Sequence, residues 1–545
     1  MASCLNLQLK WYLSATTFIV LIVCSSLQSK HVNPMFQREH AQSGLGVNSI
    51  STTNGGAAAR MLGHSPPHGA KSRRQLLDDD QDETMKEVPN FQKKSSLGDG
   101  IRMELMHRDH HSSPLHHHGM NLTLAERIRR DVMRSKARTR FLSSKMMALS
   151  READHGTVKA TNVAASSSST AGIVSTDTFE SPLSATIAEY VMSLSLGTPP
   201  QKFDVVVDTG SDLVWVQCTP CAQCFQQIDP IFNPTQSSSY QTLTCSDAIC
   251  NNLGGNLNSC SPNCQYTYDY SDLSSTSGDF STETVTLSTT SGSSQAVLNF
   301  AFGCGHNNQG PFSSSDGLVG LGQGLVSFSS QLGALFGNMF SYCLVAREQA
   351  LSQTSPLLFG DAALPSVTNG LQFTPILPSS PGLSSLYYVG LEGLSVAGAL
   401  LNIQTTVFTK DSSGNGGTIF DSGTTFTQLA SPAYDAMLSA FQAAVPYSQI
   451  PGAGAQLGLE LCFDIAGVQN VAVPELTFHF TNADFNLPAP NIFVLVDTAG
   501  TMCLAFSRSS SALNIFGNTQ QQNFQILYDR VNTRIGFTPV TCSSL

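Results

Sequence analysis

The 545-residue sequence predicts a mostly β protein with two related lobes around a central cleft, preceded by a partly helical N-terminal segment. Three observations lead to this prediction. Short apolar runs separated by Gly, Ser and Pro turns continue from about residue 189 to the end of the chain. One motif, in which an apolar run leads into an Asp and a glycine turn, occurs twice. Basic residues and a helical repeat gather before residue 150.

The repeated motif carries the candidate chemistry. The first copy reads FDVVVDTGSDLVWV from residue 203 and places Asp208 between two apolar runs; the second reads TIFDSGTTF from residue 418 and places Asp421 in the same way. Each copy is followed at a similar distance by an apolar-apolar-Gly segment, which ends at Gly320 and at Gly517. An internal repeat of this kind predicts two related lobes, neither of which completes the site alone. Two carboxylates brought together share one proton, so one acts as a base toward water and the other as an acid toward a carbonyl oxygen.

These motifs resemble those of the pepsin-like aspartic peptidases over the C-terminal two thirds of the chain. The resemblance implies a bilobal pepsin-like fold with two pseudo-twofold-related β lobes, Asp208 and Asp421 as the catalytic pair, and Gly320 and Gly517 as structural glycines. It also implies that the Ser211 and Thr424 hydroxyls bond the outer carboxylate oxygens. The residues expected to support the pair are Thr209, Gly210, Ser211, Ser422, Gly423 and Thr424. No cofactor and no metal are expected.

The segment before the repeat divides by composition. Residues 1–28 predict a signal peptide, because one basic residue precedes an apolar stretch of fewer than 18 residues. Residues 29–180 are expected to form a prosegment, with 30–100 largely disordered, 103–150 a basic helical inhibitory segment and 161–180 a Ser/Thr/Ala-rich linker. The N-terminal catalytic lobe is then expected at 181–376 and the C-terminal lobe at 377–545, with one helix at about 432–445.

Charge separates the prosegment from the lobes. Residues 1–180 hold 22 of the 28 Lys and Arg, whereas residues 181–545 hold 23 of the 39 Asp and Glu. A capping-box pattern begins at Thr123, and seven basic residues stud the helix that follows. The stretch MELMHRDHHSSPL at 103–115 also looks like prosegments of the plant nepenthesin-like peptidases. We therefore expect the prosegment to lie over an acidic cleft as an intramolecular inhibitor. The alternative is a basic face that is only solvated.

A hairpin at 266–274 is the candidate flap. In the family that this sequence resembles, Tyr270 matches the flap tyrosine and Trp215 matches the indole that bonds it. Ser271 and Leu273 depart from the pattern, because glycines are usual at both positions. The departure leaves the mobility of the flap and the substrate preference open.

Twelve cysteines between residues 218 and 542 indicate six disulfides and a secretory route. Spacing alone does not choose their connectivity. A zinc site at Cys218, Cys221 and Cys224 is disfavoured, since no second CxxC follows at zinc-finger distance. The resemblance implies the pairs Cys218–Cys221, Cys224–Cys304, Cys245–Cys264, Cys250–Cys260, Cys343–Cys542 and Cys462–Cys503.

Other chemistries have weaker signals. The sequence contains no GxSxG and no HExxH, and the lobes contain only His306, expected to be structural, and His479, expected to be an exposed strand residue. The tract His116–His118 is expected to be solvated, Asn121 begins the only glycosylation sequon, and nucleic-acid binding is poorly supported.

Together these features predict a secreted aspartic endopeptidase made as a zymogen. It would hydrolyse polypeptides at acidic pH through a water between Asp208 and Asp421. We expect a monomer without stable membrane insertion, in the apoplast or extracellular space, with the vacuole as an alternative. The competing hypothesis is a non-catalytic binding or inhibitor protein on the same fold, similar to the plant xylanase inhibitors.

Overall fold

The computed structural model describes residues 100–116, 122–154, 189–270, 274–310, 312, 314–380 and 383–545, and within 122–154 it describes side chains only as far as residue 147. All of them belong to one compact unit, Phe91–Leu545. Several expectations lie outside the described residues: the signal peptide, nearly all of 30–100, His117 and His118, Asn121, the linker at 161–180, and flap residues Ser271 and Leu273. None of the helices in the described part is long and apolar enough to cross a membrane.

The fold is mostly β, as predicted. One sheet of 20 strands contains β1 Ile101–His107, β2 Tyr190–Leu196, β3 Gln201–Asp208, β4 Val214–Gln217, β5 Gln241–Thr242, β6 Leu257–Cys260, β7 Cys264–Asp269, β8 Ser275–Ser288, β9 Ser294–Gln309, β10 Gly317–Gly320, β11 Met339–Cys343, β12 Ser355–Phe359, β13 Gln372–Leu377, β14 Tyr387–Val389, β17 Thr418–Phe420, β18 Thr427–Leu429, β25 Phe506–Arg508, β26 Asn514–Phe516, β27 Phe524–Asp529 and β28 Arg534–Pro539.

Two smaller sheets complete the strands. One has the order β16 Ala399–Leu400, β15 Leu391–Val396, β21 Leu476–Phe480 and β22 Ala483–Leu487; the other has the order β19 Ser448–Gln449, β20 Cys462–Asp464, β24 Thr501–Leu504 and β23 Phe493–Leu495. The α-helices are α2 Leu124–Asp154, α3 Phe328–Phe336, α4 Ser431–Ala444, α5 Ala489–Ile492 and α6 Asn518–Gln521. Helix α4 agrees with the predicted helix to within one residue.

The sequence repeat corresponds to a repeat of strand pairing. Strand β3 runs parallel to β10, with Asp208 opposite Gly320, and β17 runs parallel to β26, with Phe420 opposite Phe516. In both halves the strand after the turn then pairs antiparallel with the apolar-apolar-Gly strand, β4 with β10 and β18 with β26. Each apolar-apolar-Gly segment therefore lies beside the strand that leads into its Asp.

The two glycines that end these segments lie where the backbone leaves no room for a side chain. A Cβ on Gly320 would lie 2.4 Å from the carbonyl carbon of Asp212. A Cβ on Gly517 would lie 2.8 Å from the carbonyl oxygen of Thr425. Both contacts are with backbone next to the Asp turns, so glycine lets the chain pass close behind each turn.

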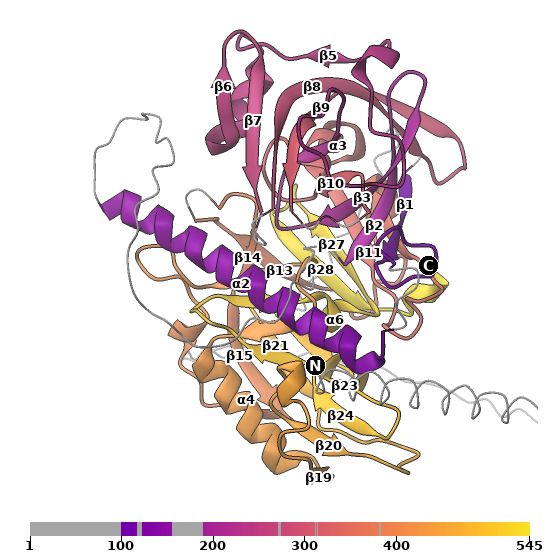
Figure 1. Ribbon diagram of the computed structural model, residues 1–545. Coiled ribbons are helices and arrows are strands. Elements are labelled where there is room, and N and C mark those ends of the chain that lie inside the picture. Colours follow the sequence, from indigo (N-terminus) through magenta and orange to yellow (C-terminus); the bar gives the residue numbers. More distant parts are fainter. Residues whose placement is uncertain are drawn as a thin grey trace, which may run out of the picture. The chain divides into compact units, whose positions relative to one another are not determined.

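The N-terminal segment is built into this fold. Strand β1 pairs antiparallel with β12 and, at its end, with β2. Helix α2 follows and begins with the predicted capping box, since Thr123 N donates to Glu126 Oε2 (2.7 Å) and Glu126 N donates to Thr123 Oγ1 (3.2 Å). Figure 1 shows α2 crossing between the magenta strands of the first lobe and the orange elements of the second.

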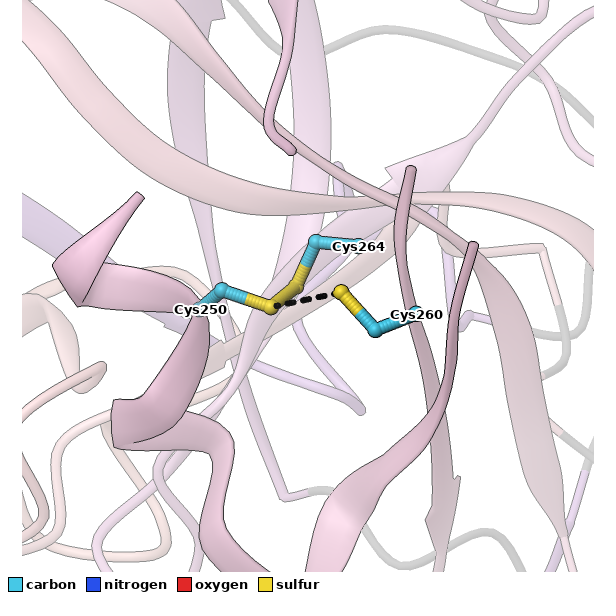
Figure 2. Close-up of side chains that lie close together, drawn as sticks. All are labelled: Cys250, Cys260 and Cys264. Carbon is cyan, nitrogen blue, oxygen red and sulfur yellow. Dashed lines mark hydrogen bonds between the residues drawn. A yellow bond between two sulfur atoms is a disulfide. The ribbon is translucent and has the colours of Figure 1, made fainter. Parts of the chain in front are cut away.

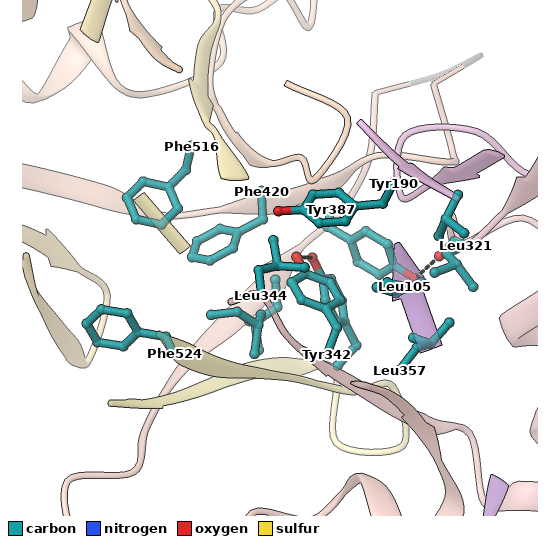
Figure 3. Close-up of a cluster of buried hydrophobic side chains, with 14 of the residues drawn as sticks. Leu105, Tyr190, Leu321, Tyr342, Leu344, Leu357, Tyr387, Phe420, Phe516 and Phe524 are labelled. Carbon is teal, nitrogen blue, oxygen red and sulfur yellow. Dashed lines mark hydrogen bonds between the residues drawn. The ribbon is translucent and has the colours of Figure 1, made fainter. Parts of the chain in front are cut away.

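The main hydrophobic core joins side chains of both lobes and of the N-terminal segment. Figure 3 shows Leu105 of β1 in the same cluster as Tyr342, Tyr387 and Phe420. Tyr387 satisfies its buried hydroxyl by donating to the carbonyl oxygen of Leu321 at 2.8 Å. Removing β1 would therefore expose part of the core that both lobes share.

Six disulfides join the twelve cysteines, but four expected pairings differ from those observed. The observed pairs are Cys218–Cys304, Cys221–Cys224, Cys245–Cys260, Cys250–Cys264, Cys343–Cys542 and Cys462–Cys503. Cys218 follows β4, whose parallel partner β9 carries Cys304 beside Val216, and this register leaves Cys221 and Cys224 to pair.

Among Cys250, Cys260 and Cys264, the expected and the observed partners lie close together. The sulfurs of Cys250, Cys260 and Cys264 lie within 4.8 Å of one another, and Cys250 Sγ is 3.8 Å from Cys260 Sγ, its expected partner (Figure 2). Cys260 and Cys264 face each other on β6 and β7. All three thiols are consumed in disulfides, as are those of Cys218, Cys221 and Cys224, so neither group offers thiolate ligands to zinc.

Candidate active site

The structure brings Asp208 and Asp421 together at the ends of two symmetry-related strands. Gly210 N donates to Asp208 Oδ1 at 3.0 Å, and Gly423 N donates to Asp421 Oδ1 at 3.1 Å. Both carboxylates are buried. A Cβ on Gly423 would lie only 2.8 Å from Asp208 Oδ1, so the glycine allows the opposite carboxylate to approach.

A hydrogen-bond pair across the pseudo-twofold axis joins the two turns. Thr209 Oγ1 lies 3.1 Å from Ser422 Oγ and accepts from Ser422 N at 2.9 Å. Since both residues are buried, these bonds fix the position of one turn against the other. The supporting residues named from the sequence thus lie around the pair.

The expected hydroxyl contacts to the carboxylates are present in one half and absent in the other. Thr424 Oγ1 donates to Asp421 Oδ2 at 2.6 Å. Ser211 Oγ is buried without a hydrogen-bond partner, so the expectation for Ser211 is wrong in this state of the chain. Asp208 Oδ1, which accepts from Gly210 N, also accepts from a second donor, which comes from the N-terminal segment.

That donor is Arg138 of α2. Its Nη2 donates to Asp208 Oδ1 at 2.6 Å and to Asp421 Oδ1 at 2.8 Å, and its Nε donates to Asp421 Oδ2 at 2.5 Å. One nitrogen atom therefore lies within hydrogen-bond distance of both carboxylates. This is the geometry that a single water between the two carboxylates would also need.

Burial alone would lower the pKa of Arg138, but Asp208 and Asp421 outweigh it and raise that pKa above its ordinary value. The guanidinium stays charged, and its planar fork reaches both carboxylates at once. A Cβ on Gly210 would lie 2.2 Å from Arg138 Nη2 and 3.3 Å from Asp421 Oδ1, so this glycine leaves room for the arginine and for the opposite carboxylate.

A second buried charge cluster holds α2 beside the first strand of the lobes. Arg134 donates to Glu189 at 2.5 Å and pairs with Asp131, and Arg347 of the N-terminal lobe donates to Asp131 at 2.6 Å. Asp131, Arg134 and Arg138 follow each other at three and four residues, which places them on one face of the helix. Arg129 and Arg140, on other faces, are exposed.

Glu189 lies at the centre of this second cluster. Burial alone would raise its pKa, but Arg134 and the nearby His107, whose Nε2 is 3.6 Å away, hold the pKa of Glu189 well below its usual range. The buried, paired face of α2 excludes a basic helix that is merely solvated. The sequence analysis missed Glu189 and Arg347; an acidic residue directly before an apolar strand was the available signal for Glu189.

The flap residues lie as the resemblance implies. Trp215 Nε1 donates to Tyr270 Oη at 2.8 Å, and burial raises the pKa of Tyr270 well above its ordinary value. Phe312 packs edge-on against both rings. Beside them Asp212, which the sequence analysis also missed, accepts from Gly324 N at 2.8 Å and from Ser385 of the second lobe at 2.5 Å.

The two lobe histidines have polar partners. His306 Nε2 lies 3.3 Å from Asp279 and its Nδ1 lies 3.0 Å from the carbonyl oxygen of Pro220, which agrees with a structural role. The side chain of His479 is 29% exposed, so it is a half-buried strand residue.

Comparisons with known proteins cover most of the two lobes. A family model described as xylanase inhibitor N-terminal matches residues 190–361, and one described as xylanase inhibitor C-terminal matches residues 386–539. Aspartyl protease family protein 2 from Arabidopsis thaliana is 43% identical over 365 residues, which are 67% of this chain and 73% of that protein. Aspartic proteinase nepenthesin-1 from Nepenthes gracilis is 42% identical over 361 residues, 65% of this chain and 78% of that protein.

Solved structures share the fold at lower identity. The crystal structure titled edgp covers 65% of this chain and 92% of its own, with a TM-score of 0.55 and 21% identity. At that identity the likeness concerns the architecture of the two lobes.

Proposed function

The chain belongs to the aspartic protease family that includes the nepenthesins, and from this premise we propose that it is an aspartic endopeptidase made as a zymogen. The observation that carries the proposal is the shared hydrogen bonding of Arg138 Nη2 to Asp208 and Asp421. In the zymogen the arginine takes the position of the catalytic water. In the mature enzyme a water takes the position of the arginine.

The two carboxylates then have complementary tasks. The ionised one removes a proton from the water, which attacks the carbonyl carbon of the scissile peptide bond. The protonated one donates its proton to the carbonyl oxygen, and the peptide C–N bond breaks as the nitrogen is protonated. No bond forms between substrate and protein. Because the water needs one carboxylate of each kind, the activity belongs to acidic solution.

Release of the prosegment follows from the same charges. As the pH falls, the acidic lobes lose negative charge and attract the basic helix α2 less strongly, whereas the ion pair of Arg134 with Glu189 is lost last because the pKa of Glu189 is held low. Cleavage within residues 161–180 would then separate the segment from the lobes. The enzyme then works as a monomer on polypeptides, in the apoplast or extracellular space or in the vacuole.

The test uses the purified full chain. After incubation at pH 3 to 4, we expect loss of a leader of about 15–17 kDa, at roughly 110 Da per residue, together with cleavage of a quenched fluorescent peptide. At neutral pH the leader should stay attached and the peptide intact. An Asp208→Asn variant whose leader has been removed by another protease should stay inactive. Equal activity of that variant would refute the role of the dyad.

The descriptions of the matching family models favour one second candidate, a non-catalytic inhibitor protein. Both Asp turns are intact here, and the prosegment covers them with an arginine, which such a protein would not need. Absence of peptidase activity from the acid-processed wild-type chain, with measurable inhibition of a xylanase, would favour this candidate.

A further inference from the structure

A hollow on the C-terminal lobe lies outside the site of the two aspartates. It has a volume of about 760 Å³ and is formed over β15, β21 and β22. Its lining includes Ser395, His479, Asp484 and Glu392, and none of its lining residues is Lys or Arg.

Three of these side chains form a hydrogen-bonded chain. Ser395 Oγ lies 2.6 Å from His479 Nε2, and His479 Nδ1 lies 2.7 Å from Asp484 Oδ1. An ionised Asp484 can only accept, so Nδ1 carries the imidazole proton and Nε2 is left to accept from the hydroxyl of Ser395. A hydroxyl that donates to a neutral imidazole, itself oriented by a carboxylate, is the arrangement of an activated nucleophile.

The strands are shaped to allow this arrangement. The register between β15 and β21 shifts between Leu391 and Gly393, and such bulges re-aim neighbouring side chains. A Cβ on Gly393 would lie 3.8 Å from His479 Cδ2 and 3.0 Å from Leu400, so glycine keeps the space beside the imidazole open. Asp484 is the direct cross-strand partner of His479 on β22.

We propose that Ser395, His479 and Asp484 form a second hydrolytic site, which acts on small acyl esters independently of the aspartate pair. His479 Nε2 takes the proton of Ser395 as the Oγ–acyl carbon bond forms, and gives it to the leaving alcohol oxygen as the ester C–O bond breaks. Water then hydrolyses the acyl-serine with the same imidazole as base. Two carboxylates and no Lys or Arg line the hollow, so its substrates are neutral or cationic rather than anionic.

The position of the serine limits the size of the substrate. Ser395 is only 6% exposed, whereas 56% of the Asp484 side chain is exposed. An exposed carboxylate orients the imidazole less strongly than a buried one. We therefore expect slow turnover of short acyl chains.

The experiment uses the full-length zymogen, in which Arg138 covers the aspartate pair. Incubation with a fluorophosphonate–biotin probe at pH 7.5 should label Ser395, identified by peptide mass spectrometry. Ser395→Ala should abolish the label, and His479→Gln should lower the labelling rate about 100-fold. Asp484→Asn should lower it about tenfold. p-Nitrophenyl acetate should be hydrolysed with the same ranking, and the anionic p-nitrophenyl hemisuccinate more slowly.

Ser193→Ala is the matched control, because Ser193 donates directly to Asp204 at 2.6 Å without an imidazole between them. It should leave the label unchanged. Circular dichroism and the melting temperature of each variant report that the chain is folded. Absence of label on Ser395 in the wild type, or a labelling rate that survives His479→Gln in a folded chain, would overturn the proposal, whatever the outcome for the aspartate pair.

Discussion

The turn at Asp208 and the turn at Asp421 have the same backbone but different contacts. In both turns the glycine two residues after the Asp donates to the carboxylate, and in both the strand before the Asp runs parallel to an apolar-apolar-Gly strand. Thr424 donates to Asp421, whereas the equivalent Ser211 has no partner. Arg138 makes two hydrogen bonds to Asp421 and one to Asp208.

The repeat determines the positions of the two carboxylates but not the contacts that each of them makes. The parallel strand pairs and their glycines fix where the two carboxylates lie, because the backbone has no other close path there. The hydroxyls and the arginine decide how firmly each carboxylate is held. The prosegment accordingly makes more hydrogen bonds to the second turn than to the first.

The largest expected effect is the loss of activity when either aspartate is substituted, because the two turns then no longer supply a matched pair. Asp208→Asn and Asp421→Asn should each lower kcat by about 10³-fold or more, since the water needs one base and one acid, and neither half can supply both. The measurement is peptide hydrolysis at pH 4 after removal of the prosegment at a protease site placed within 161–180. As a control, Asp464→Asn, at an exposed position, should leave kcat unchanged. A loss confined to one of the two dyad variants would contradict the shared role.

Arg138→Leu should give the next largest effect. Removing one partner of a buried ion pair costs about 3–5 kcal/mol, so the zymogen should open about 150- to 5,000-fold more often at neutral pH. Peptidase activity of the uncleaved chain at pH 6 measures this. The activity of an uncleaved Arg138→Lys chain should lie between that of the wild type and that of Arg138→Leu. A lysine keeps the charge but loses the planar fork that reaches both carboxylates.

Arg129→Leu serves as the control on the same helix, because Arg129 is exposed. It should leave the chain latent at pH 6. Latency of the Arg138→Leu chain equal to that of the wild type would show that the cluster around Glu189 suffices to hold α2 in place.

Thr424→Val and Ser211→Ala test the asymmetry directly. A hydrogen bond to a charged group contributes about 1.5–3 kcal/mol, so Thr424→Val should lower kcat/KM about 10- to 100-fold. Ser211→Ala should change it less than about threefold, since no bond is lost. Equal losses in the mature enzyme would show that Ser211 finds Asp208 once Arg138 has left.

Most of the fold and the central site could be predicted from sequence, for physical reasons. Asp208 and Asp421 stand in a repeated pattern of local residues, and parallel pairing with the Gly320 and Gly517 strands follows from that pattern. The capping box at Thr123 and helix α4 depend on neighbouring residues only.

Contacts between distant segments could not be predicted in the same way. Among the nine Lys and Arg of α2, the choice of Arg138 depends on how the helix is placed across the lobes, and no local pattern encodes that placement. The cysteine pairs implied by the resemblance failed in two places: at Cys218, where the register of β4 on β9 brings Cys304 near, and at Cys250, Cys260 and Cys264, whose sulfurs lie within 4.8 Å of one another. The chain Ser395–His479–Asp484 arises from strand register, which the sequence did not reveal.

The smallest expected effect concerns the stability of the N-terminal lobe rather than activity. The residue before β10 is Asp316, whereas the residue before β26 is Leu513, and both are buried. Burial, together with the nearby carboxylate of Asp229, raises the pKa of Asp316 to about 7. Asp316 Oδ2 accepts from Asp204 N at 2.6 Å, a bond that an asparagine oxygen can also accept.

The direction in which stability changes with pH follows from proton binding. Between about pH 4 and 7 the folded chain binds a proton at Asp316 that the unfolded chain has lost, so the free energy of unfolding falls as pH rises through this range. A shift of this size corresponds to about 4 kcal/mol at most. Asp316→Asn should therefore raise the melting temperature at pH 7.5 and leave it nearly unchanged at pH 4, measured by circular dichroism. A rise of equal size at both pH values would mean that the substitution stabilises the lobe through packing and not by removing an ionisable group. The predicted pH dependence would make acid both the condition that activates the dyad and the one in which its first lobe is most stable.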